Sequence, residues 1–278
     1  MTGFLRATFL AFLMLLPAAA AADDTPLAAL QTADDARQWE AVGRLDFGGG
    51  AFCTGALISE RHVLTAAHCL FVKSTGQQLD PSVIEFRAGW RNGRAEAYRS
   101  VRRAVIHPDY VYAPDDTLPY VANDVALLEL TQPIRNGRIR PFEIAPGPDA
   151  GAQVGVVSYA ADRSERPSLQ EVCHVMARQQ GLLVMSCSVN FGSSGAPVFT
   201  FAGGTARIAS VVSAKAETNG TAISLGTGLT TQLADLKAAL ARGEGVFQSA
   251  APQMVAPRVI SPGGGAGNAA KFVRPGGN

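Results

Sequence analysis

The stretch CTGALISERHVLTAAHC, residues 53–69, begins and ends with a cysteine and places His68 directly before the second one. The 278-residue chain has 4 cysteines, and the other two, Cys173 and Cys187, form a second close-spaced pair in the other half of the sequence. Four cysteines allow three disulfide pairings. Whether they form disulfides at all depends on the compartment in which the chain folds.

Residues 1–22 have the three-part plan of a secretory signal peptide. Arg6 is their only charged residue, ATFLAFLMLLP is the apolar centre, and AAAAA supplies small residues before Asp23. We expect cleavage after Ala22 and therefore a secreted or periplasmic protein. A membrane anchor is the alternative, but the apolar run is short for a bilayer core of ~30 Å. No later segment of the sequence is long and apolar enough to span a membrane, so no membrane contact is expected after signal removal.

Export to an oxidising compartment favours disulfides among the four cysteines. We expect the local pairing, Cys53 with Cys69 and Cys173 with Cys187. Each bridge would close a loop of about 15 residues, which contributes roughly 3 kcal/mol of stability if the effect is entropic. A zinc site is the rival use, but neither pair has the Cys-x-x-Cys spacing that such sites prefer.

Charge and composition describe an ordinary globular protein. The sequence has 47% hydrophobic and 17% charged residues, and its 24 basic and 23 acidic residues give a formal net charge of +1. This balance creates no field that would concentrate nucleic acid. The sequence also shows no metal-ligand cluster and no phosphate-binding loop. We therefore expect a monomer without a cofactor and without a nucleic-acid partner.

Between Trp39 and about Gly228 the sequence alternates short apolar runs with turn residues. Runs of this length, rich in Val, Ile, Phe and Tyr, are typical of antiparallel strands. Asn219-Gly220 is better interpreted as a hairpin turn than as part of a glycosylation acceptor. Because β-α-β alternation is missing, the pattern indicates an all-β chain of packed sheets or barrels. The clearest runs are AFCTGALIS, VIEFRAGW, DVALLEL, AQVGVVSY, GAPVFTF and IASVVSA.

One helix is expected, in TTQLADLKAALARGEG at residues 230–245. Thr231 is expected to cap its start, Arg242 suits its last turn, and Gly243 ends it. Its apolar face consists of Leu233, Leu236 and Leu240.

The two ends of the exported chain differ from its centre. Residues 23–38 are polar and Ala-rich, which indicates a leader or flexible arm that can serve as a propeptide. Residues 246–278 are rich in Gly, Pro and Ala and have no periodicity, so we expect a disordered tail. The folded domain is therefore expected to span residues 39–245.

Three short segments carry side chains that can act together. They are LTAAHC at 64–69, NDVALLEL at 123–130 and FGSSGAPVF at 191–199. Taken alone, His68 is an ordinary surface or core histidine, Asp124 is a turn residue, and GSSG is a Gly/Ser turn. Gly192 and Gly195, however, permit backbone geometry around Ser194 that other residues resist, and they let a substrate approach the chain closely.

In this order, the three segments resemble the signature segments of the trypsin-like (chymotrypsin-fold) serine proteases. CTGALISERHVLTAAHC is similar to the family's strand, turn and strand closed by a disulfide. VIHPDY at 105–110 resembles its common His-Pro turn, and SVVSA at 210–214 resembles the strand that lines its primary pocket. The resemblance runs from about Trp39 to Arg242.

The resemblance implies an all-β fold of two antiparallel Greek-key β-barrels, with the active site in the cleft between them and a helix at the C-terminal end. The first barrel is expected at about 39–140, the second at about 145–230 and the helix at about 232–242.

The resemblance also implies a division of chemical work. Ser194 would be the nucleophile, and because a serine hydroxyl is weakly nucleophilic at neutral pH, His68 would take its proton. Asp124 would fix the tautomer of the imidazole and stabilise the imidazolium. The N–H groups of Gly192 and Ser194 would form the oxyanion hole, in which one donor is typically worth ~3–4 kcal/mol of barrier.

By the same resemblance, Ser213 would donate a hydrogen bond to Asp124, and Ser213, Ala214 and Lys215 would present backbone to a bound peptide. The expected function is a secreted or periplasmic serine endopeptidase that acts on protein or peptide substrates. Two alternatives stay open: a catalytically inactive binding or regulatory homologue, and an esterase-like or autoprocessing hydrolase on the same fold.

Two features depart from the trypsin branch of the family. That branch has an aspartate before the nucleophile, which pairs with an amine released by zymogen cleavage, whereas Ser193 stands here. No Ile-Val-Gly-Gly start is present, and the nearest equivalent is EAVGRLDF at 40–47. Both halves of the ion pair are therefore missing, as expected for a bacterial-type branch without this activation pair. We hypothesise that Ser193 makes neutral hydrogen bonds and that no buried amine is needed.

The expected specificity pocket also departs from trypsin. Residues 182–200 contain no Asp or Glu, so no carboxylate is available there to select Arg or Lys. Lys215, near the entrance, can favour acidic side chains, although a solvated surface lysine is the more common situation.

Overall fold

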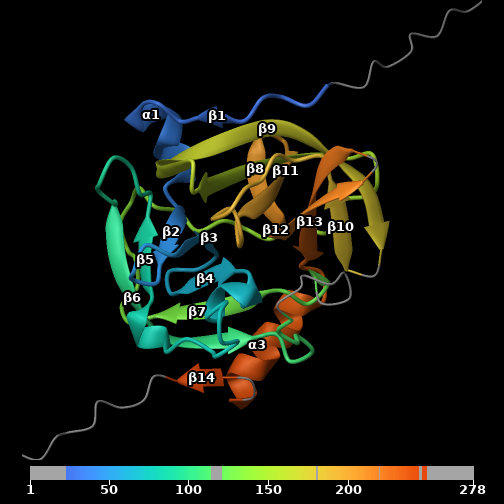
Figure 1. The fold of residues 1–278 in the computed structure, drawn as a ribbon. Coiled ribbons are helices and arrows are strands. Elements are labelled where there is room, and N and C mark those ends of the chain that lie inside the picture. The colour runs from blue at the N-terminus through green and yellow to red at the C-terminus, as the bar shows by residue number, and fades with distance from the viewer. Residues whose placement is uncertain (1–22, 114–120, 180, 219, 244–245, 249–278) are drawn as a thin grey trace, which may run out of the picture.

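The computed structural model describes residues 23–113, 121–179, 181–218, 220–243 and 246–248 (Figure 1). The expected signal peptide and residues 249–278 of the expected disordered tail lie outside these described residues. Within the described ranges, no helix has the length and apolar character needed to cross a membrane.

The first half of the chain folds into a closed antiparallel barrel with the strand order β6-β5-β2-β3-β4-β7, and pairing of β6 with β7 completes the ring. Its strands obey the period of two expected of a barrel wall, because in β5 Phe86 and Ala88 are buried while Glu85 and Arg87 are partly exposed. The strands are β2 (Val42–Asp46), β3 (Phe52–Leu57), β4 (His62–Thr65), β5 (Glu85–Ala88), β6 (Ala97–Ile106) and β7 (Ala126–Leu130).

The second half repeats this plan with the order β9-β10-β13-β12-β11-β8, and pairing of β8 with β9 closes it. The β12–β13 hairpin turns where Asn219-Gly220 was expected to turn, because Thr218 pairs with Thr221 and Gly220 has a φ of +76°. The two-barrel, all-β prediction is therefore confirmed. The strands are β8 (Gln153–Ala160), β9 (Arg163–Gln179), β10 (Leu182–Met185), β11 (Pro197–Ala202), β12 (Thr205–Thr218) and β13 (Thr221–Gly228).

The expected C-terminal helix is α3 (Gln232–Arg242), which lies beside the first barrel in Figure 1. Leu236 is fully buried on its apolar face, and Gly243 ends it with a φ of +74°. The expected cap by Thr231 is wrong. Thr231 has helical backbone angles, whereas a capping residue usually has an extended backbone, and its hydroxyl bonds to the Gln232 side chain instead. The short helices are α1 (Ala33–Ala36), η1 (Arg37–Trp39), η2 (Ala67–Leu70) and η3 (Pro81–Val83).

Residues 23–38, expected to be a leader or flexible arm, lie along the outside of the second barrel (Figure 1). Strand β1 (Ala28–Ala29) pairs with β9 at Ser168 and Leu169, and the Thr25 N–H bonds to the Val172 carbonyl. β1 can pair with β9 because β10 pairs with β9 only from Val175 onward. The earlier part of that edge of β9 therefore offers unpaired backbone groups to β1. A propeptide role for this segment stays a prediction.

Three residues of the expected disordered tail are ordered instead. Strand β14 (Val246–Gln248) pairs with residues 103–105 of β6 and continues the sheet of the first barrel. The expectation of disorder is therefore wrong for these residues, because the edge of β6 at that position offers unpaired backbone groups that a composition argument does not consider.

An aromatic cluster connects the segment before β2 to the second barrel. The ring of Trp39 lies 5.0 Å from that of Phe199 on β11, and Phe142, from the connection between the barrels, lies 4.7 Å from Phe199. Phe199 is 0% exposed and belongs to a core that runs continuously from the first barrel into the second. Burial of these rings therefore helps to hold the barrels in a fixed relation.

Replacing Phe199 by Ala is expected to lower the free energy of unfolding by about 3–5 kcal/mol, because the change removes a fully buried ring and leaves a cavity. The measurement is urea unfolding followed by circular dichroism. Phe201→Ala on the same strand is the matched control, because Phe201 is 45% exposed and its loss should cost about 1 kcal/mol or less. Equal losses in the two variants would contradict this description of the core.

Candidate active site

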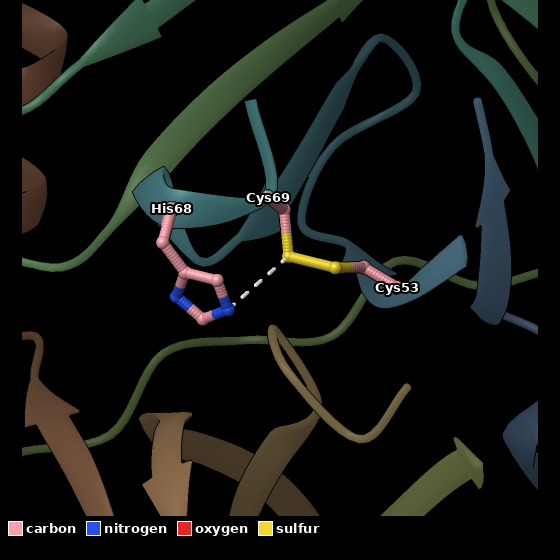
Figure 2. A group of neighbouring side chains, drawn as sticks. All are labelled: Cys53, His68 and Cys69. Carbon is pink, nitrogen blue, oxygen red and sulfur yellow. Dashed lines mark hydrogen bonds between the residues drawn. A yellow bond between two sulfur atoms is a disulfide. The ribbon is translucent and has the colours of Figure 1, made fainter. Parts of the chain in front are cut away.

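His68 is held at the surface of the first barrel by a disulfide. It lies on η2, directly after β4, and the Cys53–Cys69 bridge ties η2 to β3 (Figure 2). The second bridge, Cys173–Cys187, is also present, so the expected local pairing is confirmed. His68 Nε2 lies 3.9 Å from Cys69 Sγ, but sulfurs joined in a disulfide cannot act as thiolate ligands. This group of side chains is therefore no metal site.

Asp124 comes just before β7 and is almost fully buried, with 4% of its side chain exposed. One carboxylate oxygen accepts the backbone N–H of His68 at 2.8 Å, and the other lies 2.6 Å from His68 Nδ1. The second oxygen also accepts a hydrogen bond from the Ser213 hydroxyl on β12, as the resemblance implied. Asp124 therefore joins a residue of the first barrel to a residue of the second.

The position of Ser213 follows from an irregularity in β12. The register between β12 and β13 shifts between Val212 and Ala214, so Ser213 is skipped by the regular pairing. A bulge of this kind re-aims a side chain. The bulge explains how a strand residue can reach the buried carboxylate of Asp124 in the other barrel.

The surroundings of Asp124 keep its carboxyl ionised. Burial by itself raises the pKa of Asp124, but the charge of His68 and the hydrogen bonds from His68 and Ser213 together hold the pKa below its ordinary value. Because an ionised carboxylate only accepts hydrogen bonds, the contact at Nδ1 requires a proton on that nitrogen of His68. The neutral imidazole then has Nε2 as its acceptor, which is the nitrogen a general base uses.

Ser194 lies in a tight bend between Gly192, with a φ of +95°, and Gly195, with a φ of +79°. The Ser194 carbonyl accepts the N–H of Thr54 on β3 at 2.9 Å. Gly195 packs so closely on the end of β4 that a Cβ atom there would lie 2.1 Å from Thr65 Oγ1. Since η2 begins two residues after Thr65, this packing places Ser194 beside the segment that bears His68.

The two N–H groups expected in the oxyanion hole have no acceptor within the described part of the chain. Their directions are set by the carbonyls of the same peptide units, because N–H and C=O of a trans peptide point in opposite directions. The Phe191 carbonyl accepts the Ala161 N–H at 2.7 Å, which orients the Gly192 N–H away from Ala161. The Ser193 carbonyl accepts the Ala196 N–H at 2.9 Å and fixes the Ser194 N–H in the same way.

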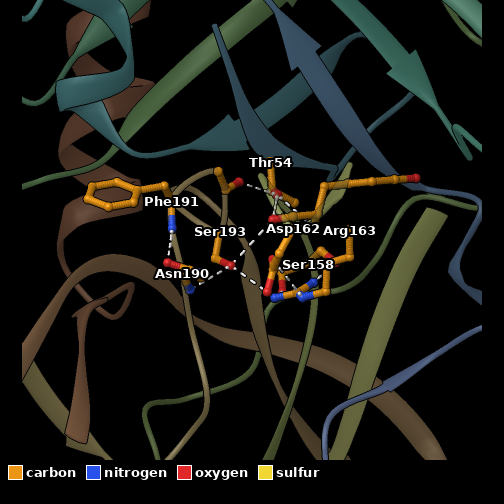
Figure 3. Close-up of polar contacts among 9 residues, drawn as sticks. Thr54, Ser158, Asp162, Arg163, Asn190, Phe191 and Ser193 are labelled. Atoms are coloured by element: carbon orange, nitrogen blue, oxygen red, sulfur yellow. Dashed lines mark hydrogen bonds and ion pairs between the residues drawn. The ribbon is translucent and has the colours of Figure 1, made fainter. Parts of the chain in front are cut away.

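Ser193 makes the neutral hydrogen bonds that were hypothesised, and it has one charged partner in addition. Its buried hydroxyl lies 3.3 Å from the Tyr159 carbonyl and 3.2 Å from the Asn190 N–H, which are neutral partners. It also accepts a hydrogen bond from the Arg163 guanidinium at 3.2 Å (Figure 3). Sequence patterns gave no signal for this arginine, because the β8–β9 hairpin brings it to Ser193 from 30 residues away.

Ser213, Ala214 and Lys215 lie on a part of β12 that has β13 on one side only. Strand β11 pairs with β12 no further than Val211, so the opposite edge beyond that point has no partner strand among the described residues. Such an edge can add a peptide strand. Lys215, which is exposed, also lines a pocket whose other walls are Ser186, Cys187, Ser188, Val189, Ala222 and Ile223.

Comparison with known proteins agrees with this geometry. Residues 31–235 match the family model described as Trypsin. Serine protease 23 of Rattus norvegicus is 27% identical over 169 residues, which cover 53% of this chain and 42% of that protein. A Trypsin of Phaedon cochleariae is 34% identical over 105 residues, which cover 37% of this chain and 36% of that protein. The chain therefore aligns with less than half the length of these curated relatives.

Among solved structures, a Glu endopeptidase in complex with MPD superimposes with a TM-score of 0.62 at 17% identity, over 80% of this chain and 99% of that one. This likeness shows the chymotrypsin fold. Two closed barrels with a histidine and a carboxylate in contact at their junction define the class as a serine peptidase scaffold. The chain belongs to the trypsin family, because the family model covers most of its length.

Replacing Asp124 by Asn is expected to destabilise the protein mainly above about pH 4, the ordinary pKa of an unfolded aspartate. Because the native pKa of Asp124 is lowered, its carboxylate stabilises the folded state above the unfolded pKa, and this contribution is lost as the pH falls through the native pKa. Urea unfolding of both proteins should therefore show a larger difference at pH 7 than at the lowest pH at which both still fold. A difference that does not change with pH would contradict the lowered pKa.

Proposed function

We propose that the protein is an exported serine endopeptidase in which Ser194, His68 and Asp124 form the catalytic triad. The observation that carries the proposal is the buried carboxylate of Asp124, which binds the Nδ1 and N–H of His68 and is in turn held by Ser213. Export rests on the predicted signal peptide and agrees with the two disulfides.

The proposed reaction begins with proton transfer from the Ser194 hydroxyl to His68 Nε2 as the serine oxygen attacks the carbonyl carbon of the scissile peptide. The negative charge that develops on the carbonyl oxygen is stabilised by the N–H groups of Gly192 and Ser194. His68 then gives the proton to the leaving amine, and an acyl-enzyme remains on Ser194. A water molecule, deprotonated by His68, hydrolyses this ester and restores the serine.

Two further observations support catalysis rather than a binding role on the same scaffold. Asp124 is kept ionised in a buried position, and burial of a charge is unfavourable unless it is paired and hydrogen-bonded. Hydrogen bonds to the Phe191 and Ser193 carbonyls fix the directions of the Gly192 and Ser194 N–H groups, as a preorganised oxyanion hole requires. An acyl-transfer site of the Ser-His-Asp type uses both features.

We also propose that the pocket beside Lys215 prefers an acidic side chain before the cleaved bond. Ser186, Ser188 and Lys215 line the pocket, and none of the described residues that line it is an Asp or Glu. A carboxylate side chain can accept hydrogen bonds from all three groups, whereas a lysine or arginine side chain would meet a like charge. The structural likeness to a protein titled Glu endopeptidase is consistent with this preference.

A fluorophosphonate probe is expected to label Ser194 in the folded protein, and Ser194→Ala is expected to abolish the label. The same variant should reduce kcat for peptide hydrolysis by roughly 10⁴- to 10⁶-fold, because members of a triad act as a unit. Mass spectrometry of the labelled peptide identifies the modified residue.

Ser100→Ala is the control, because Ser100 is an exposed serine on β6 of the first barrel. Labelling of the folded wild-type protein at another residue, or no labelling at all, would contradict the triad proposal. A labelled protein that cleaves esters but no member of a peptide library would favour the esterase-like alternative.

Digestion of a peptide library is expected to show cleavage after Glu or Asp in preference to Lys or Arg. Lys215→Ala should weaken the preference by about two- to fivefold, because an exposed ion pair is worth about 0.2–1 kcal/mol. Lys237→Ala, an exposed lysine on α3, is the matched control and should leave the preference unchanged. Preferred cleavage after Lys or Arg would rule out this assignment without affecting the triad.

A further inference from the structure

We infer that the tip of the β8–β9 hairpin, residues 160–163, is an internal clamp that holds the serine loop, residues 190–195, in its working conformation. Arg163 is the positioning residue of this clamp, and it acts through Ser193. The inference rests on the proposed function, since it concerns how the same site is organised without trypsin's ion pair between an aspartate and a new N-terminal amine.

Ser193 is the point at which the serine loop is anchored. Its side chain is 0% exposed, and its hydroxyl oxygen is in hydrogen-bond range of three groups at once. It accepts from the Asn190 N–H and from Arg163, and it donates to the Tyr159 carbonyl (Figure 3). Ser193 is adjacent to both Gly192 and Ser194, so a rotation of its backbone would move both oxyanion-hole N–H groups.

Arg163 is built into the second barrel rather than lying on its surface. Its side chain is only 13% exposed, and its guanidinium donates to the Ser158 carbonyl at 2.7 Å and to the Ser158 hydroxyl at 3.1 Å. Its nearest carboxylate in the described part of the chain is that of Asp162, at 3.8 Å, which is 62% exposed. Burial lowers the pKa of Arg163, with the charge of Asp162 opposing this shift.

Burial of the Arg163 charge costs free energy of desolvation, so we infer that this arginine has a role besides the folding of the hairpin. A largely buried guanidinium is normally paired with a carboxylate, and here it is satisfied mainly by neutral oxygens of Ser158 and Ser193. A guanidinium presents its donors in a rigid planar fork. Nη1 donates to the Ser158 carbonyl, and Nη2 donates to the Ser158 hydroxyl and also to the Ser193 hydroxyl. The contacts with Ser158 therefore fix the direction in which Nη2 meets Ser193.

The clamp has a second point of contact through the backbone. The Ala161 N–H donates to the Phe191 carbonyl at 2.7 Å, and this carbonyl belongs to the same planar peptide as the Gly192 N–H. A Cβ atom on Gly192 would also lie 3.1 Å from the Cα of Ala160, so the loop packs directly on the hairpin. Thr54 closes the other side, because its hydroxyl donates to the Gly192 carbonyl at 2.8 Å.

No new N-terminus is needed for these contacts. The stretch that corresponds to the start of activated trypsin is here part of a continuous, packed chain: Trp39 is buried, and the Ala41 carbonyl accepts the Leu57 N–H at 2.9 Å. The charged group that contacts Ser193, the residue before the proposed nucleophile, is the guanidinium of Arg163 from the second barrel. We therefore expect the serine loop to be organised as soon as the chain has folded.

The first test measures kcat and KM separately. Arg163→Ala is expected to lower kcat by about 10- to 100-fold with little change in KM, because a displaced oxyanion hole weakens binding of the transition state and not of the substrate. The affinity for a peptide boronic acid, which mimics the tetrahedral intermediate, should fall by a similar factor. Arg163→Lys should recover part of the loss, since an ammonium group can reach Ser193 but cannot form the fork.

Arg166→Ala is the matched control, because Arg166 lies on the same strand and bonds to Gln31 at the surface. Its kcat should stay within about twofold of wild type, as expected for a surface change. If Arg163→Ala does not fold, Ser193→Ala, which removes the acceptor and keeps the arginine, should show the same fall in kcat at constant KM. Full activity of both single variants, Ser193→Ala and Arg163→Lys, would overturn the clamp.

A second test measures the coupling between the two residues. Ser193→Asp is expected to keep kcat within about tenfold of wild type, because the new carboxylate can pair with Arg163. The double variant Ser193→Asp with Arg163→Ala should lose kcat relative to Arg163→Ala by a factor at least about ten times larger than the factor that Ser193→Asp alone loses relative to wild type, since the double variant leaves a buried charge unpaired. Strictly additive effects in these four chains would overturn a direct contact.

A third test concerns the N-terminus. A chain that begins at Asp23 should be fully active, and trimming to Ala41 should not raise its activity. Activity that appears only after trimming would overturn the internal clamp and would leave the triad proposal standing. A wild-type chain that is neither labelled at Ser194 nor active would overturn both.

Discussion

The structure depends on the burial of one carboxylate, that of Asp124, at the junction of two barrels. An ionised group in such a position is tolerated because His68 of the first barrel supplies two donors for its oxygens and Ser213 of the second barrel supplies a third. The same hydrogen bonds that offset the desolvation of Asp124 also fix the tautomer and orientation of the imidazole. One set of contacts therefore serves both the stability of the barrel junction and the geometry of the candidate site.

The contacts that surround this carboxylate are local consequences of ordinary folding rules. The Cys53–Cys69 bridge places η2 against β3, the bulge in β12 turns Ser213 toward the other barrel, and two glycines with positive φ let the serine loop pack on β3 and β4. Together they bring a histidine, a carboxylate and a serine loop from three distant segments to one junction, as the fold of the trypsin family does.

The sequence predicted those parts of the molecule that are marked by short sequence motifs. LTAAHC, NDVALLEL and FGSSGAPVF indicated the barrels and the candidate site, and the close spacing of the cysteines indicated both disulfides. It did not predict contacts that arise from strand edges and hairpins. The pairing of β1 with β9 depends on how far β10 extends, and the approach of Arg163 to Ser193 depends on the β8–β9 register, so neither leaves a local pattern. Thr231 shows the converse, since a favourable residue type does not cap a helix when its backbone is already helical.

A crystal structure of the wild-type protein after reaction with a peptide phosphonate tests the proposed triad and oxyanion hole together. We expect a covalent bond from Ser194 Oγ to phosphorus, with one phosphonyl oxygen within about 2.7–3.1 Å of the N–H groups of both Gly192 and Ser194. We also expect His68 to keep its contact with Asp124 while Nε2 faces the adduct. A phosphonate bound elsewhere, or bound at Ser194 with its oxygen turned away from both N–H groups, would show that this site does not work as a Ser-His-Asp triad with that oxyanion hole.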